Sequence, residues 1–122
     1  MDDAAPTQLR LPPSPRSPRL AREWADRFLR DSGHLALAAS TALIVSELVT
    51  NAMVHTDGGA TLRLSIRAAD PPVVRVEVED SAPDAVVEPT LEGTGLRLIA
   101  ENCRAWGVER TATTKTVWAE LS

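Results

Sequence analysis

The sequence predicts an α+β fold, a two-layer sandwich whose mixed, mostly antiparallel sheet is covered on one face by three helices. Segments with apolar residues at helical spacing stand beside segments in which apolar and polar residues alternate, so the chain contains both helices and strands. These segments follow the order strand, helix, helix, strand, strand, helix, strand, strand, which differs from the strict alternation of a parallel α/β fold. A length of 122 residues suits one domain.

The start of the chain predicts an arm, a short strand and a helix. Proline and serine are frequent there, and we expect residues 1–8 to form a flexible arm and residues 9–122 a single domain. Leu9-Arg10-Leu11 alternates and predicts an edge strand. Ser17-Pro18 predicts the start of the first helix, with the serine as its cap, and Ser32-Gly33 predicts its end. The apolar face of this helix consists of Leu20, Ala21, Trp24, Ala25, Phe28 and Leu29.

A second, longer helix is expected from about Leu35 to Val54, and Thr56-Asp57-Gly58-Gly59 should stop it. Two strands with alternating apolar residues follow, at 61–67 and 74–79, and should pair as an antiparallel hairpin with one wet face. The buried stripe expected on the helix consists of Leu37, Thr41, Ile44, Val45, Leu48 and Ala52.

The C-terminal part predicts one more helix and one more hairpin. The helix should start near Thr94, carry Cys103 on its apolar face and end at Gly107. Residues 108–112 and 116–121 should then pair as the final two strands.

Composition excludes several classes of function. The net charge is −4 and no Lys/Arg stripe occurs, which argues against nucleic-acid binding. We find no apolar run of about 18 residues and no secretory signal, and therefore expect no membrane span and a cytoplasmic protein. The single Cys103 fits a reducing compartment and is expected to be a small core residue. Lys115 is the one lysine among 13 basic residues, a bias typical of GC-rich bacterial genomes.

Glu47 and Asn51 lie one turn apart on the second helix. They are separated by about 40° around its axis and border the apolar stripe. A carboxamide oxygen such as that of Asn51 suits Mg²⁺, which keeps several waters and takes phosphate oxygens as further ligands. Glu47 can accept a proton from a water or a hydroxyl. The alternative is a solvated polar flank of the helix.

Asp80 follows Val74, Val76 and Val78 at the period of a strand, so its carboxylate is expected on the face that the helices cover. A carboxylate in that place requires a partner, and the exocyclic amine of adenine is one such donor. The alternative is that Asp80 has left the strand and caps the turn at Ser81.

Gly93-Thr94-Gly95-Leu96 opens the last predicted helix. Two glycines allow a close approach of the backbone to a ligand, and free N–H groups at a helix start attract phosphate. A flexible loop followed by a helix cap is the alternative.

The combination of these segments resembles one family. Residues 46–55 (SELVTNAMVH) closely resemble the N-box of the GHKL ATPases, residues 78–83 (VEDSAP) are similar to their G1 region, and residues 93–99 (GTGLRLI) resemble their G2 region. Residues 106–121 resemble the closing hairpin of an actinobacterial branch related to the serine-kinase anti-sigma factors. The resemblance covers roughly residues 10–121.

The resemblance implies the Bergerat, histidine-kinase-like ATPase fold and a site for Mg-ATP. It implies that Asn51 binds the Mg²⁺, that Glu47 is the general base and that Asp80 accepts a hydrogen bond from the adenine amine. Thr116 would support the adenine through Asp80 or a water. The other nucleotide-binding residues that it implies are Pro83, Gly93, Thr94, Gly95 and Leu96.

The resemblance also implies a function. The chain would be an ATP-dependent protein serine/threonine kinase that phosphorylates an anti-sigma-factor antagonist, with a sigma factor as the competing partner. Its G1 region, residues 80–84, lacks both glycines of the family pattern, and its lid, residues 84–92, is short. A module that binds ATP or ADP without chemistry is therefore a second hypothesis, and a scaffold that binds no nucleotide is a third. A homodimer through the first helix or the N-terminal strand is a further expectation.

Overall fold

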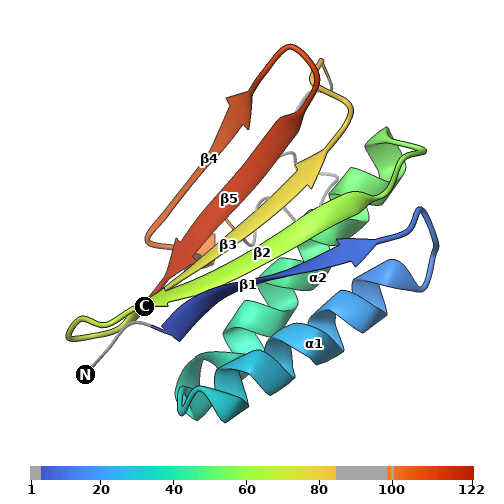
Figure 1. The fold of residues 1–122 in the computed structure, drawn as a ribbon. Coiled ribbons are helices and arrows are strands. Elements are labelled where there is room, and N and C mark those ends of the chain that lie inside the picture. The colour runs from blue at the N-terminus through green and yellow to red at the C-terminus, as the bar shows by residue number, and fades with distance from the viewer. Residues whose placement is uncertain (1–3, 85–98, 100) are drawn as a thin grey trace.

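The computed structural model describes residues 4–84, 99 and 101–122, which form a five-stranded sheet with two long helices packed on one of its faces (Figure 1). The strand order is β1-β2-β3-β5-β4, and every pairing of these strands is antiparallel. The elements are β1 (Ala4–Leu11), α1 (Ser17–Asp31), α2 (Leu35–His55), β2 (Ala60–Arg67), β3 (Val73–Asp80), β4 (Ala105–Arg110) and β5 (Lys115–Leu121).

The strand β1 is longer than the sequence predicts. It begins at Ala4 and pairs with β2, with Thr7 opposite Leu64 and Leu11 opposite Ala60. Residues 4–8, expected to be part of a flexible arm, are therefore strand, and that expectation is wrong for them. Their side chains do not alternate in polarity, and the pairing shifts register between Ala4 and Thr7, so the periodicity that identifies a strand is lost there.

The helix α1 starts and ends where the sequence predicts, but its start is stabilised differently. Ser17 lies inside the helix, and its hydroxyl donates to the carbonyl of Pro12 at 2.6 Å instead of capping the helix. At the other end Gly33 has φ 81°, and the N–H of His34 reaches the carbonyl of Leu29 at 2.8 Å. This left-handed glycine stop is the one the sequence predicts.

The helix α2 is the central element of the core, since it packs against α1, β2, β3 and β5. Thr41, Ile44, Val45, Leu48 and Ala52 of the predicted stripe are all buried, and Leu37 is partly buried. Residues Leu35–Val54 also form one helix that is long and apolar enough to cross a membrane, with a mean hydropathy of 1.5. Polar residues such as Ser46, Glu47 and Asn51 interrupt this stretch, so it is not an unbroken apolar run, and the absence of a membrane span stays a prediction. A helix in the core of a two-layer fold is long and apolar because it is covered on several sides.

The sequence predicts that Gly107 ends a helix, and this prediction is wrong. Gly107 lies within β4. It stands opposite Trp118 of β5, and a Cβ at this position would lie 2.8 Å from the indole ring. The missing side chain therefore leaves room for that ring. Because Gly107 follows a helical pattern in the sequence, it is easily taken for the end of a helix instead. Of the third predicted helix the structure describes Ile99 and residues 101–102, which are helical, and the N–H of Cys103 donates to the carbonyl of Ile99 at 2.9 Å.

Candidate functional site

The carboxylate of Asp80 lies at the end of β3, facing the helices. Like Val76 and Val78 before it, the residue is buried, with its side chain 1% exposed. Its Oδ1 accepts the backbone N–H of Ala82 at 2.8 Å. The inward-facing alternative drawn from the sequence is the one observed, and the other is wrong because Asp80 is still paired within β3. Its carboxylate nevertheless also stabilises the turn that follows the strand.

The second oxygen of Asp80 is paired with a lysine. Its Oδ2 lies 3.2 Å from Nζ of Lys115, the residue directly opposite Asp80 in β5, and the lysine side chain is 2% exposed. Among the described residues no other carboxylate lies within ion-pair distance of Lys115. Each charge offsets the cost of removing the other from water. The sequence analysis missed Lys115, although it stands two residues before Val117 and so belongs to the helix-facing side of β5.

The flank of α2 contributes Glu47 and Asn51. Both residues are half-buried, and both border the stripe of Ile44 and Leu48, as their spacing predicts. The Nδ2 atom of Asn51 is buried and has no hydrogen-bond partner among the described residues. The nitrogen and oxygen of an amide are distinguished only by their hydrogen-bond partners, so the buried atom can be either one. In both cases one end of the Asn51 amide has unused hydrogen-bonding capacity.

The end of α2 and the end of β3 are held together. The hydroxyls of Thr56 and Ser81 lie 3.0 Å apart, and the N–H of Gly58 donates to the Thr56 hydroxyl at 3.1 Å. Thr56 follows Asn51 by five residues, a rise of about 7.5 Å along a helix. Figure 1 shows α2 and β3 ending at the same end of the sandwich, so Asn51 and Asp80 belong to one region of the molecule.

The other predicted site residues divide into three cases. Pro83 is half-buried, and its carbonyl accepts Nε of Arg110 at 2.9 Å, which ties the turn after β3 to the end of β4. Thr116 follows Lys115 in β5 and stands opposite Glu79, so it lies on the face of the sheet away from the helices, and the structure does not bring it to Asp80. Four predicted residues lie outside the described residues: Gly93, Thr94, Gly95 and Leu96.

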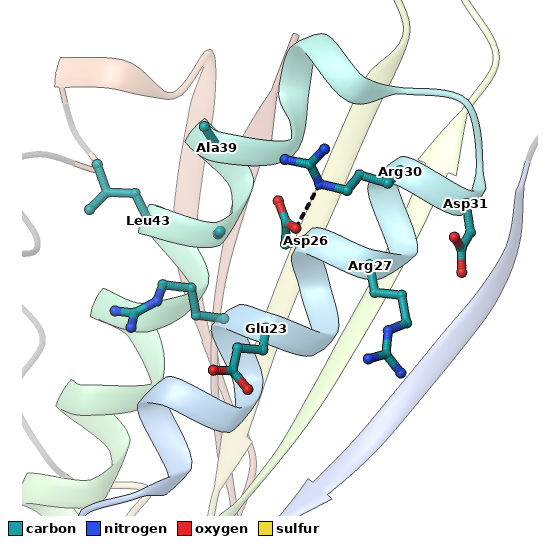
Figure 2. Close-up of a pocket in the computed structure, with 9 residues that line it drawn as sticks. Glu23, Asp26, Arg27, Arg30, Asp31, Ala39 and Leu43 are labelled. Atoms are coloured by element: carbon teal, nitrogen blue, oxygen red, sulfur yellow. Dashed lines mark hydrogen bonds and ion pairs between the residues drawn. The ribbon is translucent and has the colours of Figure 1, made fainter.

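A groove of about 730 Å³ lies elsewhere, between α1 and α2 on the outer side of the helix layer (Figure 2). Ala39, Ala42 and Leu43 form its apolar part, and an ion pair of 2.7 Å between Asp26 and Arg30 spans part of its rim. None of the predicted site residues that the structure describes lines this groove. Glu47 follows Leu43 by four residues and therefore lies one turn further along a neighbouring flank of α2.

Two further observations limit what the site can do. Within residues 4–84, 99 and 101–122, no group of three His, Cys, Asp or Glu side chains is placed to hold a metal ion. Burial raises the pKa of the Cys103 thiol to about 11, so the thiol is protonated at neutral pH.

Comparison with solved structures establishes the fold. The RsbU and RsbW domains of a Mycobacterium tuberculosis protein superpose with a TM-score of 0.69 at 20% identity, over 97% of this chain and 32% of that one. The SiaB–SiaC complex from Pseudomonas aeruginosa superposes with a TM-score of 0.63 at 12% identity, over 94% of this chain and 89% of that one. The two-layer α+β fold that the resemblance implied is shared with these structures and is confirmed.

The chain spans about a third of the length of the mycobacterial chain that it matches. No protein-family model and no curated protein matches the sequence.

Proposed function

We propose that this chain binds Mg-ATP between α2 and the sheet and acts as an anti-sigma-factor-like regulatory protein. The observation that carries the proposal is the buried carboxylate of Asp80 at the helix-facing end of β3, next to the end of α2. An acceptor in that place suits the exocyclic amine of adenine. The polar flank of α2 then lies toward the phosphates, where Glu47 and Asn51 would act.

The residues present fit a magnesium ion bound together with phosphate. One end of the Asn51 amide is buried without a partner, and a carboxamide oxygen is a ligand that Mg²⁺ accepts. Asn51 would hold the ion. When bound, Mg²⁺ would neutralise charge on the phosphate oxygens.

We propose further that the chain is a protein serine/threonine kinase. The hydroxyl oxygen of a partner's serine or threonine would form a bond to the γ-phosphorus, and the bond from that phosphorus to ADP would break. Glu47 would accept the hydroxyl proton, and the chain's remaining contribution would be to position the reactants. The partner of this reaction would be an anti-sigma-factor antagonist, and a sigma factor would compete for the same protein. The similarity to a protein found in a two-protein complex, SiaB–SiaC, supports a protein partner.

The second candidate is a module that binds ATP or ADP and changes its affinity for a protein partner without chemistry. The turn after Asp80 favours it, because Ala82 and Asp84 stand where the family pattern has glycines, and Pro83 is tied to Arg110. Such a turn has less freedom to close over a triphosphate. The homodimer and the cytoplasmic location also stay proposals.

A pair of measurements tests the proposal. Calorimetry with ATP, with and without Mg²⁺, should give binding that weakens in Asp80→Ala and loses its Mg²⁺ dependence in Asn51→Ala. Transfer of labelled γ-phosphate to a cognate antagonist should fall by about 10²–10⁴-fold in Glu47→Gln, because the general base is removed.

The control variant is Glu23→Gln, which removes a carboxylate that is 61% exposed on α1 and should change neither result. Binding without phosphate transfer, with partner affinity unaffected by Glu47→Gln, would exclude the kinase and leave the nucleotide-gated module. The absence of any binding heat would exclude both.

A further inference from the structure

The buried lysine has no role in the function proposed so far. Lys115 is one of the largest fully buried side chains, and it shares the helix-facing side of β5 with Val117, Ala119 and Leu121. An apolar residue would continue that pattern at no electrostatic cost. A lysine is tolerated here because Asp80 stands opposite it, 3.2 Å away.

The pair places a donor beside an acceptor. An ammonium group has three N–H donors and no acceptor, and a carboxylate accepts only, with about two lone pairs on each oxygen. The N–H of Ala82 uses one of these at Oδ1, and Lys115 lies against Oδ2. Both groups therefore retain bonding capacity, one as donor and one as acceptor. The base edge of adenine carries the complementary set, an amine N–H beside the ring acceptor N1.

We propose that Lys115 determines the base specificity of the site by donating a hydrogen bond to the N1 acceptor of adenine while Asp80 accepts from the adenine amine. The inference rests on the proposed function and names a residue that the sequence analysis had not placed there. The resemblance to the GHKL ATPases had implied Thr116 as the supporting residue of β5. The register of the sheet puts Lys115, and not Thr116, beside Asp80 and on its face.

A merely structural ion pair makes a different prediction. If Lys115 only neutralised Asp80, its removal would lower stability and would weaken every purine nucleotide to the same degree. If Lys115 donates to N1, its removal must abolish the difference in affinity between ligands with and without an acceptor at N1. Selectivity between ligands that differ only at N1 therefore separates the two roles.

The experiment uses ATP and 1-deaza-ATP, in which a C–H replaces the N1 acceptor. Calorimetry on the unsubstituted protein with Mg²⁺ should show 1-deaza-ATP binding about tenfold or more weakly than ATP, the loss expected for one hydrogen bond to a charged donor. In Lys115→Met the affinity for ATP should fall to that for 1-deaza-ATP. Thr116→Val should retain the discrimination of the unsubstituted protein.

Equal affinities for ATP and 1-deaza-ATP in the unsubstituted protein would overturn the inference and leave the proposed function intact. This arm needs no variant, so it decides the matter even if Lys115→Met does not fold. Discrimination that survives in Lys115→Met, or that is lost in Thr116→Val, would also overturn it. Failure of the unsubstituted protein to bind ATP at all would refute the proposed function itself.

Discussion

Removal of Lys115 is expected to reveal how much stability the buried ion pair supplies. In Lys115→Met the carboxylate of Asp80 keeps the N–H of Ala82 but loses its opposite charge, 3.2 Å away. Two unit charges at that separation interact by about 5 kcal/mol at an effective dielectric of about 20. Water screens the pair little, since the two side chains are 2% and 1% exposed. Breaking one side of such a pair typically costs about 3–5 kcal/mol, and we expect a loss in this range.

The assay is a double-mutant cycle measured by urea unfolding. Asp80→Asn should be costly for the same reason, because it leaves the ammonium of Lys115 without its counter-charge. The double variant removes both charges, so its loss should be smaller than the sum of the two single losses by at least about 2 kcal/mol. Arg19 and Glu23 on α1 form a matched control, since they are 76% and 61% exposed and should couple by only a few tenths of a kcal/mol. Additive losses at Lys115 and Asp80 would refute the buried pair.

The remaining predictions concern two glycines and the cysteine. Gly59→Ala should lower the free energy of unfolding by about 2 kcal/mol or more, because the residue has φ 78° and its new Cβ would lie 2.2 Å from the carbonyl oxygen of Leu11; a change below about 0.5 kcal/mol in urea unfolding would contradict this. Gly107→Ala should displace the ring of Trp118, seen as a shift in tryptophan emission, because its Cβ would lie 2.8 Å from that ring; an unchanged spectrum would contradict it. Cys103 should be alkylated about a hundredfold more slowly in the folded than in the unfolded protein at pH 8, because burial raises its pKa from 9.0 to about 11; equal rates would contradict this.

Much of the fold could be predicted from local patterns. The boundaries of α1 and α2 follow from apolar spacing and from the left-handed stop at Gly33, all of which are local signals. Asp80 was placed on the helix-facing side by the alternation of β3 alone, and it lies there. The start of β1 could not be predicted in this way, because pairing with β2 holds residues 4–8 in a strand whatever their side chains.

The errors at the site have a different origin. The sequence does not show which residue of β5 stands opposite Asp80, because that depends on the register between two strands that are far apart in the chain. The face that Lys115 occupies was available from local alternation, since it precedes Val117 and Ala119 at period two, but the predicted strand began at Thr116 and so left Lys115 out. Gly107 was assigned to a helix end. A side chain at this position would collide with the ring of Trp118. That contact is between two strands and cannot be predicted from the residues around Gly107.

The two ends of the proposed site differ in how well the chain satisfies its own polar groups. At the base end, Asp80 already has the N–H of Ala82 and the ammonium of Lys115. A ligand there adds hydrogen bonds to two groups that already have partners, so contacts at this end select between bases more than they add affinity. At the phosphate end, the buried amide of Asn51 has no partner among the described residues, and a group that bonds to it removes an existing cost. The affinity for a nucleotide should therefore come mainly from its phosphates and their metal ion. The selectivity for adenine over other bases should come from the pair of Asp80 and Lys115. On the proposed function, in which the chain releases and rebinds its nucleotide, folding would then not depend on the nucleotide.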